Sequence, residues 1–379
     1  MVDLADKLPS SETVPRWIFF VTPLLEIKNL RIEFLSGDAG LRAVDEVSLT
    51  VETGEIVCLV GESGCGKSVT ALSIARLVPA PPARYVGGQI LLNGRDVLKM
   101  SNAELCKLRG GVVSYVFQEP SASLNPVLRV GSQIKEVLKL HRPQKATAAE
   151  VLRLLKLVGI PAPESRIKDY PFQMSGGMQQ RVMIAMALAS EPKLLVADEP
   201  TTALDVTIQA QILDLLRGLK QQFGMAILLI THNLGIVGDM ADRVAVMYAG
   251  QIVELAPTGE LLRRPLHPYT RALINSVPRL AGVGGGGAWS VRASERRTNA
   301  PTLHAPTLHA PTTPPSDLRL SAIPGNVPRL GDFPPGCRFA PRCPIAKPQC
   351  SVAQPELVEV EPNRWVRCPF WQNETNLSR

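Results

Sequence analysis

Three short segments carry residue types and spacings that suit nucleotide chemistry. The first, GESGCGKS, matches the pattern G-x-x-x-x-G-K-[ST] and is called the phosphate loop below. Its glycines let backbone N–H groups cradle phosphates, Lys67 adds a positive charge, and the Ser68 hydroxyl can ligate Mg²⁺. We therefore predict nucleotide contacts along the loop and the residue after it: Gly61, Glu62, Ser63, Gly64, Cys65, Gly66, Lys67, Ser68 and Val69.

The second segment, KLLVADEP, places two acidic residues at the end of an apolar run. Asp198 at the carboxyl end of such a strand can hold Mg²⁺, and Glu199 is placed to polarise a water that attacks the γ-phosphate. Many strands end in acids, so this segment alone is only moderately specific. Paired with the phosphate loop, it predicts nucleotide hydrolysis.

The third segment, QMSGGMQQR, puts Ser175, Gly176 and Gly177 before a strongly helical run. Free N–H groups and the positive end of the helix dipole make this helix start an anion site. The alternative is a simple helix cap. A second phosphate-binding element in one chain is useful if two chains meet head to tail and complete each other's sites.

These segments need an α/β domain to position them. GEIVCLVG reads as a buried strand ending at Gly61, followed by a helix over 67–78. PKLLVADEP and MAILLITH are continuous apolar runs, typical of strands buried on both faces of a parallel sheet. DRVAVMYAGQIVELA predicts a hairpin that turns at Ala249–Gly250 and closes the domain.

The composition divides the chain into four parts. Residues 1–23 read as a loosely ordered extension and 24–280 as the nucleotide-binding domain. Residues 281–318 contain four consecutive glycines, many prolines and a tandem APTLH repeat, which predicts a flexible linker. His304 and His309 lie in that repeat, and duplicated linker sequence explains them better than metal binding. Residues 319–379 form a small proline-rich module with four cysteines.

Charge and hydropathy restrict the location and the partners. The chain has no run of about 18 apolar residues and no signal-peptide pattern near its start, so we expect a cytoplasmic protein. Residues 263–379 carry fifteen Lys and Arg against seven Asp and Glu. This excess indicates a solvated face, or contact with anionic headgroups or an acidic partner. No aromatic-interleaved basic motif accompanies it, which argues against nucleic-acid binding.

The cysteines of the module allow four interpretations. Disulfides are rare in the cytoplasm, and the spacing C-x5-C-x6-C-x17-C lacks the C-x2-C pairs typical of structural zinc. Independent buried thiols remain an alternative. Cysteines on proline-rich loops with few apolar residues suit an iron–sulfur cluster. The candidate ligands are Cys337, Cys343, Cys350 and Cys368.

The complete motif set resembles the ATP-binding cassette (ABC) ATPases. It comprises the phosphate loop, YVFQEP, the signature segment Ser175–Gln179, VADEP, ALD and LITHN. The resemblance implies a P-loop fold with a RecA-like core, an antiparallel β subdomain and a helical signature subdomain. It also assigns roles: Gln118 contacts Mg²⁺ or the attacking water, His232 holds the γ-phosphate, Asp205 bridges two cassettes, Phe34 stacks on adenine, and Gln179 belongs to the nucleotide-binding signature. The alternative for Phe34 is the core.

A closer resemblance is to the ATPase subunits of oligopeptide and dipeptide importers. It is carried by PSASLNPVLRVGSQI, ADEPTTALDVTIQAQI, HPYTRAL, IPGNVPRL and the cysteine arrangement. It implies ATP, Mg²⁺ and a [4Fe–4S] cluster, and a complex at the cytoplasmic face of the inner membrane. The complex contains two permeases, an extracytoplasmic binding protein and a paralogous cassette, with a homodimer as the alternative.

Two questions follow from this resemblance. The first is where a permease binds: apolar residues that follow Gln118 would line a groove for a permease helix, and the alternative is that they pack inside the helical insertion. These residues are Leu124, Pro126, Val127 and Leu128. The second is which solute is transported: a peptide, a nickel chelate or another peptide-like compound. A non-transport ABC ATPase would usually carry two cassettes or a long coiled coil, and neither is visible in the sequence.

Overall fold

The protein was analysed as a computed structural model that describes residues 22–36, 39–202, 204–276 and 323–374. The predicted linker 281–318, its two histidines and nearly all of the predicted extension 1–23 lie outside these residues. No helix of the described ranges is long and apolar enough to cross a membrane.

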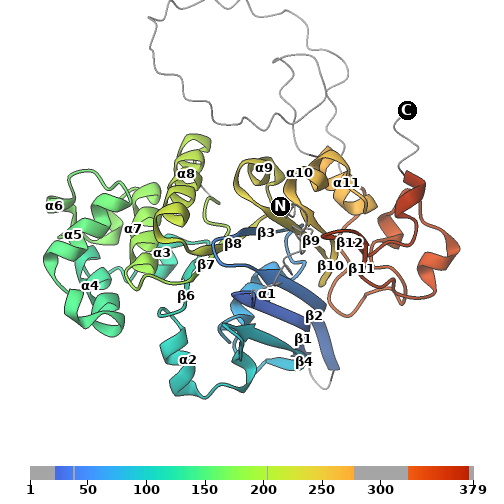
Figure 1. Ribbon diagram of the computed structural model, residues 1–379, viewed down its shortest axis with the longest axis horizontal. Coiled ribbons are helices and arrows are strands. Elements are labelled where there is room, and N and C mark those ends of the chain that lie inside the picture. The colour runs from blue at the N-terminus through green and yellow to red at the C-terminus, as the bar shows by residue number, and fades with distance from the viewer. Residues whose placement is uncertain (1–21, 37–38, 203, 277–322, 375–379) are drawn as a thin grey trace, which may run out of the picture.

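An eight-stranded sheet forms the centre of the molecule, in the order β11-β12-β10-β9-β3-β8-β7-β6 (Figure 1). Its strands are β3 (Ile56–Val60), β6 (Val113–Val116), β7 (Leu194–Asp198), β8 (Ala226–Thr231), β9 (Arg243–Tyr248), β10 (Gln251–Pro257), β11 (Val358–Glu361) and β12 (Arg364–Val366). Strands β9, β3, β8, β7 and β6 are parallel, and β3, β7 and β8 are the apolar runs predicted as buried strands. The β9–β10 hairpin turns at Ala249–Gly250, as predicted.

Apolar side chains on both faces hold the central sheet in place. In β3, Ile56, Cys58 and Val60 join one hydrophobic cluster, whereas Val57 and Leu59 join the other. Successive side chains of a strand point to opposite faces, so a continuous apolar run feeds two cores at once. The sheet therefore has little freedom to tilt, and it fixes the loops at its carboxyl edge.

A second, antiparallel sheet covers one side of the core in the order β2-β1-β4-β5. It contains β1 (Leu25–Ser36), β2 (Ala39–Val51), β4 (Ala83–Leu92) and β5 (Arg95–Asp96). This is the expected antiparallel subdomain, and it lies below the central sheet in Figure 1.

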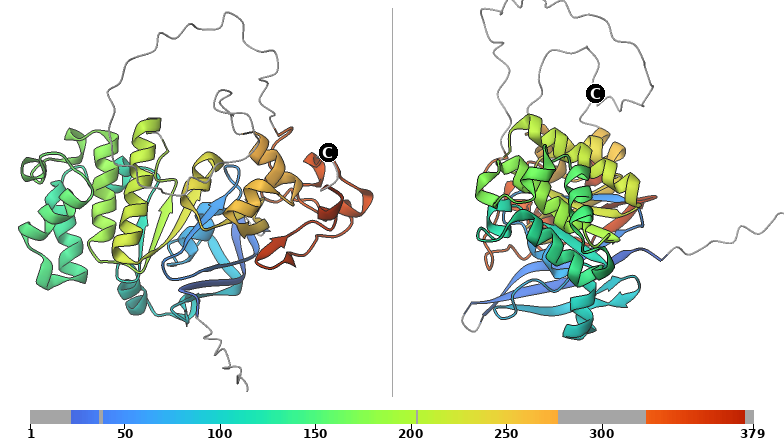
Figure 2. Two further views of the ribbon diagram at one scale, coloured as in Figure 1. Left: turned by 45° about the horizontal axis from the view of Figure 1, so that its top comes forward. Right: turned by 90° about the vertical axis from the view of Figure 1, so that its left-hand side faces the viewer.

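The helices divide into a core set and an outlying set. The core set is α1 (Lys67–Ser73), α2 (Asn102–Leu108), α8 (Val206–Phe223), α9 (Val237–Met240), α10 (Thr258–Arg263) and α11 (Pro268–Asn275). The outlying set forms the helical subdomain: α3 (Pro120–Ser123), α4 (Val130–His141), α5 (Ala148–Leu157), α6 (Pro163–Arg166) and α7 (Gly176–Leu188). The helical subdomain and the C-terminal residues lie at opposite ends of the molecule (Figure 2).

Helix α1 is shorter than the sequence predicts. The expected helix spans 67–78, but α1 ends at Ser73. Arg76 adopts a left-handed φ of 50°, and Pro79 disfavours a helical conformation at Val78. The apolar pattern continues beyond Ser73 because Ile74 and Val78 stay buried in the core past the last residue of the helix.

Residues 323–374 form the C-terminal module. It packs on the described residues between 22 and 276, called the cassette, rather than standing apart from them. Strand β12 pairs with β10 in antiparallel register, Glu254 opposite Val366 and Leu255 opposite Trp365. The module therefore extends the central sheet by two strands. The charge of the module does not all lie on a solvated face, because four of its arginines are buried: Arg338, Arg342, Arg364 and Arg367.

Candidate nucleotide site

The phosphate loop follows β3 and leads directly into α1. Gly61 has no room for a side chain, because a Cβ there would collide with the carbonyl oxygen of Met247. Gly66 has a φ of 103°, which only glycine adopts readily, and it caps the start of α1. Both glycines are thus required by the turn that connects strand and helix.

Lys67 closes the phosphate loop upon itself. Its buried ammonium donates hydrogen bonds to the carbonyl oxygens of Gly61 at 2.9 Å and Glu62 at 3.0 Å. Ser63, Gly64 and Ser68 are exposed, whereas burial raises the pKa of the Cys65 thiol. The loop therefore presents open backbone at its tip, with the lysine ammonium held beneath it.

Glu199 is the meeting point of three loops at the carboxyl edge of the sheet. Its Oε2 lies 3.2 Å from Gln118 Nε2, 3.1 Å from His232 Nδ1 and 2.9 Å from Thr202 Oγ1. Gln118 follows β6, His232 follows β8 and Glu199 follows β7, so the parallel sheet brings the three predicted residues together. Thr202 was not predicted, although the polar turn DEPTT that contains it was the available signal.

The backbone at Glu199 is strained. Its φ of 46° is in the left-handed region, which is uncommon for a residue with a side chain. Its N–H donates to the carbonyl of Ile230 at 3.0 Å, which holds the turn against β8. Such strain persists only where the surroundings impose it, and it often marks functional positions.

Asp198 and Ser68 fit a magnesium ion. Asp198 is buried at the end of β7, and its Oδ1 has no hydrogen-bond partner. Burial raises the pKa of Asp198, although a hydrogen bond with the Ser68 side chain opposes that shift. A buried, unpartnered carboxylate oxygen beside a serine hydroxyl is a hard oxygen donor set of the kind that Mg²⁺ prefers.

The signature segment begins α7, far from the phosphate loop of the same chain. Ser175 caps the helix by accepting a hydrogen bond from the N–H of Met178 at 3.4 Å. Ser175 and Gly176 are exposed, and Gly177 packs close to Ile208 of α8. Asp205 is also exposed, at the start of α8. Signature and Asp205 thus remain free for a contact outside the chain's own site.

Three glutamines brace the loops that precede three helices, each at the fourth residue of its helix. Gln179 of α7 donates to the carbonyls of Pro171 at 2.9 Å and Met174 at 3.2 Å. Gln133 of α4 and Gln209 of α8 do the same to the carbonyls eight and five residues before them: Asn125, Leu128, Thr201 and Leu204. The braces were not predicted. The amide of Gln179 holds the signature loop, and its nucleotide contact stays a prediction.

The remaining predicted residues lie at the edges of the site. Phe34 of β1 is half-buried and packs against the hydrophobic cluster of the antiparallel sheet, so its stacking on adenine stays a prediction. The prediction that Leu124 lines a permease groove is wrong, because Leu124 is buried in the hydrophobic core. Pro126, Val127 and Leu128 are exposed.

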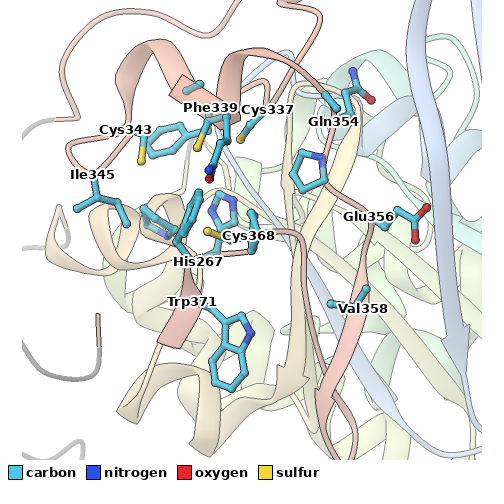
Figure 3. Close-up of a pocket in the computed structure, with 18 residues that line it drawn as sticks. His267, Cys337, Phe339, Cys343, Ile345, Gln354, Glu356, Val358, Cys368 and Trp371 are labelled. Carbon is cyan, nitrogen blue, oxygen red and sulfur yellow. The ribbon is translucent and has the colours of Figure 1, made fainter. Parts of the chain in front are cut away.

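The four module cysteines line one cavity of about 290 Å³, together with His267 and Phe339 (Figure 3). Burial raises the pKa of the Cys368 thiol to about 12. Within the described ranges, no group of three or more His, Cys, Asp or Glu is placed to hold a metal ion. The structure brings the predicted ligands to one cavity but does not show a metal site.

Comparison with known proteins identifies the family. Residues 44–202 match the ABC transporter family, and residues 253–301 and 309–350 match the oligopeptide/dipeptide transporter C-terminal region. The oligopeptide transport ATP-binding protein AppD of Bacillus subtilis is 45% identical over 356 residues, which cover 93% of this chain and 98% of that protein. The chain belongs to the ATP-binding proteins of ABC peptide transporters.

Other relatives agree with this membership. A probable peptide ABC transporter ATP-binding protein of Sinorhizobium fredii, y4tR, is 46% identical over 91% of this chain and 94% of its own length. Among solved structures, the ADP- and phosphate-bound dimer of the ATP-binding cassette MJ0796 superposes with a TM-score of 0.56 at 27% identity. The superposition covers 62% of this chain and 98% of the chain of MJ0796. The P-loop ABC cassette fold is thereby confirmed, and the ABC ATPase hydrolyses ATP.

Proposed function

We propose that this ABC ATPase energises the uptake of di- and oligopeptides across the cytoplasmic membrane. The observation that carries the proposal is the convergence of Gln118, Glu199 and His232 beside an intact phosphate loop, in a chain with the peptide-transporter C-terminal region. A nickel chelate or another peptide-like solute is the second candidate.

In the proposed reaction, the chain's own groups bind and orient ATP. The loop N–H groups and Lys67 hold the β- and γ-phosphates, and His232 contacts the γ-phosphate. Ser68 and Asp198 would hold Mg²⁺, which would neutralise charge on the phosphates when bound. Glu199 accepts a proton from the attacking water, while Gln118 and Thr202 orient its carboxylate.

The working unit that we propose is a pair of cassettes arranged head to tail. The exposed Ser175 and Gly176 at the start of the thirteen-residue helix α7 offer N–H groups and a positive dipole end to the partner's γ-phosphate. Exposed Asp205 would then meet the partner cassette. The proposed partner is a paralogous ATPase subunit, with a second copy of this chain as the alternative.

Two permeases and an extracytoplasmic binding protein complete the proposed complex at the cytoplasmic face of the inner membrane. Val127, with 76% of its surface exposed, and Leu128 are apolar residues at the surface of the helical subdomain. They follow Gln118 by about ten residues, so a permease helix docked there would be linked to the nucleotide site. We also propose the division predicted from the sequence, in which a flexible linker over 281–318 joins the ATP-binding domain, 24–280, to the C-terminal domain, 319–379.

The replacement Glu199→Gln tests the catalytic assignment. It keeps the shape of the side chain but removes the base, so steady-state hydrolysis should fall at least about 100-fold while ATP binding persists. The variant should also accumulate a closed cassette dimer, measured by size-exclusion chromatography with ATP. Near wild-type turnover would show that Glu199 is not the catalytic base.

The solute requires a separate experiment. Uptake of a panel of di- to pentapeptides and of a nickel chelate would be measured in a strain that lacks the chain, with and without the wild-type chain restored. Restored peptide uptake supports the proposal, whereas restored nickel uptake alone would favour the second candidate. Copurification with two multi-span permeases would support the complex, and association with ribosomes instead would contradict it.

We also propose an iron–sulfur cluster at Cys337, Cys343, Cys350 and Cys368. The support is that four thiols, the ligand type that iron–sulfur clusters use, line one cavity of about 290 Å³, although within the described residues they are not grouped closely enough to hold a metal ion. The cluster would connect loops that share few apolar contacts. Anaerobic purification with iron and acid-labile sulfide analysis is the test: about four irons per chain support it, and zinc alone would refute it.

A further inference from the structure

An ion pair joins the C-terminal module to the phosphate loop. Arg342 Nη1 lies 3.0 Å from Glu62 Oε1, and Nη2 lies 3.1 Å from Glu62 Oε2. This two-pronged contact is the strong form of an arginine–carboxylate pair. It links positions separated by 280 residues in the sequence, and only 5% of the Arg342 side chain is exposed.

The remaining donors of Arg342 are bonded as well. Nε donates to the carbonyl of Pro324 at 2.8 Å, and the two Nη groups donate to the Tyr248 hydroxyl at 3.3 Å and the carbonyl of Ile323 at 3.4 Å. The guanidinium is therefore held by the module and by β9 before it meets the loop. Such a group is preorganised, because little side-chain freedom is lost when it pairs.

Two hydrogen bonds hold the backbone of Glu62, and one of them comes from the loop lysine. Its backbone N–H donates to the Tyr269 hydroxyl at 3.0 Å, and its carbonyl accepts from Lys67 Nζ at 3.0 Å. Tyr269 packs against Phe339 of the module with ring centroids 5.4 Å apart. The module thus contacts Glu62 directly through Arg342 and indirectly through Tyr269.

The charge of Glu62 is a problem for a loop that binds a polyanion. A carboxylate in the phosphate loop repels the phosphates, and the repulsion grows with the number of phosphate charges. A positive group paired with that carboxylate cancels most of its field. Arg342 supplies the cancelling charge from outside the cassette.

We propose that Arg342 is a positioning residue that neutralises Glu62 and so sets the affinity of the phosphate loop for nucleoside triphosphate. The C-terminal module is then a part of the nucleotide site that acts through Glu62. This inference rests on the proposed role of the phosphate loop in binding ATP.

The test is nucleotide affinity in the full-length chain, measured by calorimetry with ATP, ADP and AMP. Arg342→Ala should raise the Kd for ATP about 10-fold, and the Kd for AMP by no more than about 3-fold, because repulsion scales with phosphate charge. Adding Glu62→Gln to Arg342→Ala should restore most of the ATP affinity. A role confined to folding would weaken all nucleotides alike and would not be rescued by Glu62→Gln.

Two further pairs of variants keep the test decisive. If Arg342→Ala does not fold, Arg342→Lys and Arg342→Gln are compared instead: Lys retains the charge and should bind ATP more tightly, and equal Kd values would overturn the inference. Arg264→Ala is the matched control, because it removes the same charge from another pair across this interface, with Glu361. Its Kd for ATP should stay at the wild-type value.

Lys67→Ala separates this inference from the proposed function. Loss of ATP binding in that variant supports the phosphate loop as the nucleotide site. If Lys67→Ala loses ATP and Arg342→Ala binds ATP as the wild type does, the inference fails while the proposed function stands. If Lys67→Ala still binds ATP normally, the proposed function itself fails.

Discussion

The cassette and the C-terminal module bury different kinds of side chain. The cassette packs aliphatic residues into two clusters, one on each face of the central sheet. Among residues 323–374, the buried apolar side chains are Phe339 and Val366, whereas the buried charged ones are Arg338, Arg342, Arg364 and Arg367. The cassette therefore folds around an apolar core. The module instead folds against the cassette, whose carboxylate and carbonyl oxygens accept hydrogen bonds from the buried arginines.

Each buried arginine of the module reaches the cassette. Arg338 bonds Asp45 and the carbonyl of Ala249, and Arg342 bonds Glu62. Arg364 donates to the carbonyl of Arg264 at 2.6 Å, and Arg367 to that of Ile252 at 3.0 Å. Directional polar contacts specify one docked position, and each leaves an uncompensated group if its partner is lost. We therefore expect substitutions at the cassette site to change activity first. Module substitutions should change stability first, except at Arg342, whose proposed role is in nucleotide affinity.

The largest effect is expected at Asp198 in the cassette. Asp198→Asn removes a proposed magnesium ligand, so the ATPase rate should fall about 1,000-fold while the fold is retained. The measurement is steady-state phosphate release over a range of Mg²⁺ concentrations, with circular dichroism as the folding control. If helix content falls together with activity, the contrast between cassette and module fails, because Asp198 would then be needed for the stability of the cassette as well.

The same variant makes a pH prediction. Because burial raises the pKa of Asp198, the folded protein holds that proton more tightly than the unfolded chain. Ionised Asp198 then costs stability as the pH rises from the ordinary carboxyl value through the raised one. Asp198→Asn should be more stable than wild type at neutral pH, and the gain should shrink toward pH ~4. Urea unfolding at several pH values checks this, and a destabilised variant at neutral pH would contradict it.

The next effect is expected at Arg338 in the module. Its side chain is 5% exposed and that of Asp45 is 7% exposed, so Arg338→Ala removes the buried arginine that pairs with this carboxylate. Asp45 then keeps the more exposed Arg42 and the amide of Gln251. The free energy of unfolding should fall by about 3 kcal/mol, measured in urea. Arg338→Met combined with Asp45→Asn should recover most of it. If the single variant is as stable as wild type, polar docking is not what holds the module.

The smallest effect is expected at Arg264, which pairs with Glu361 at the surface. The two side chains are 44% and 31% exposed, so solvent screens the pair. Arg264→Ala should lower the free energy of unfolding by less than about 1 kcal/mol. The contrast with Arg338 sharpens the comparison: burial of the arginine, rather than the number of ion pairs, decides what a contact contributes. Equal losses at the two positions would remove that distinction.

The same contrast explains what the sequence could predict. The phosphate loop, Asp198, Glu199 and the strands that deliver them were predictable, because each motif is local and each buried strand is a continuous apolar run. Convergence of Gln118 and His232 on Glu199 followed from the family resemblance and the parallel sheet. The Arg342–Glu62 and Arg338–Asp45 pairs were not predictable, because they join positions almost 300 residues apart and leave no periodic pattern. Leu124 misled because apolar residues in a loop look alike whether they pack or dock.

The glutamine braces have a mechanical consequence. Gln133 and Gln179 tie the loops at 125–128 and 171–174 to the first turns of α4 and α7, and these two helices pack in the same subdomain. A loop fastened to its helix moves with it as one body. The exposed apolar surface at Val127 and the signature segment at Ser175 therefore belong to one rigid unit. If the helical subdomain tilts, both surfaces move with it.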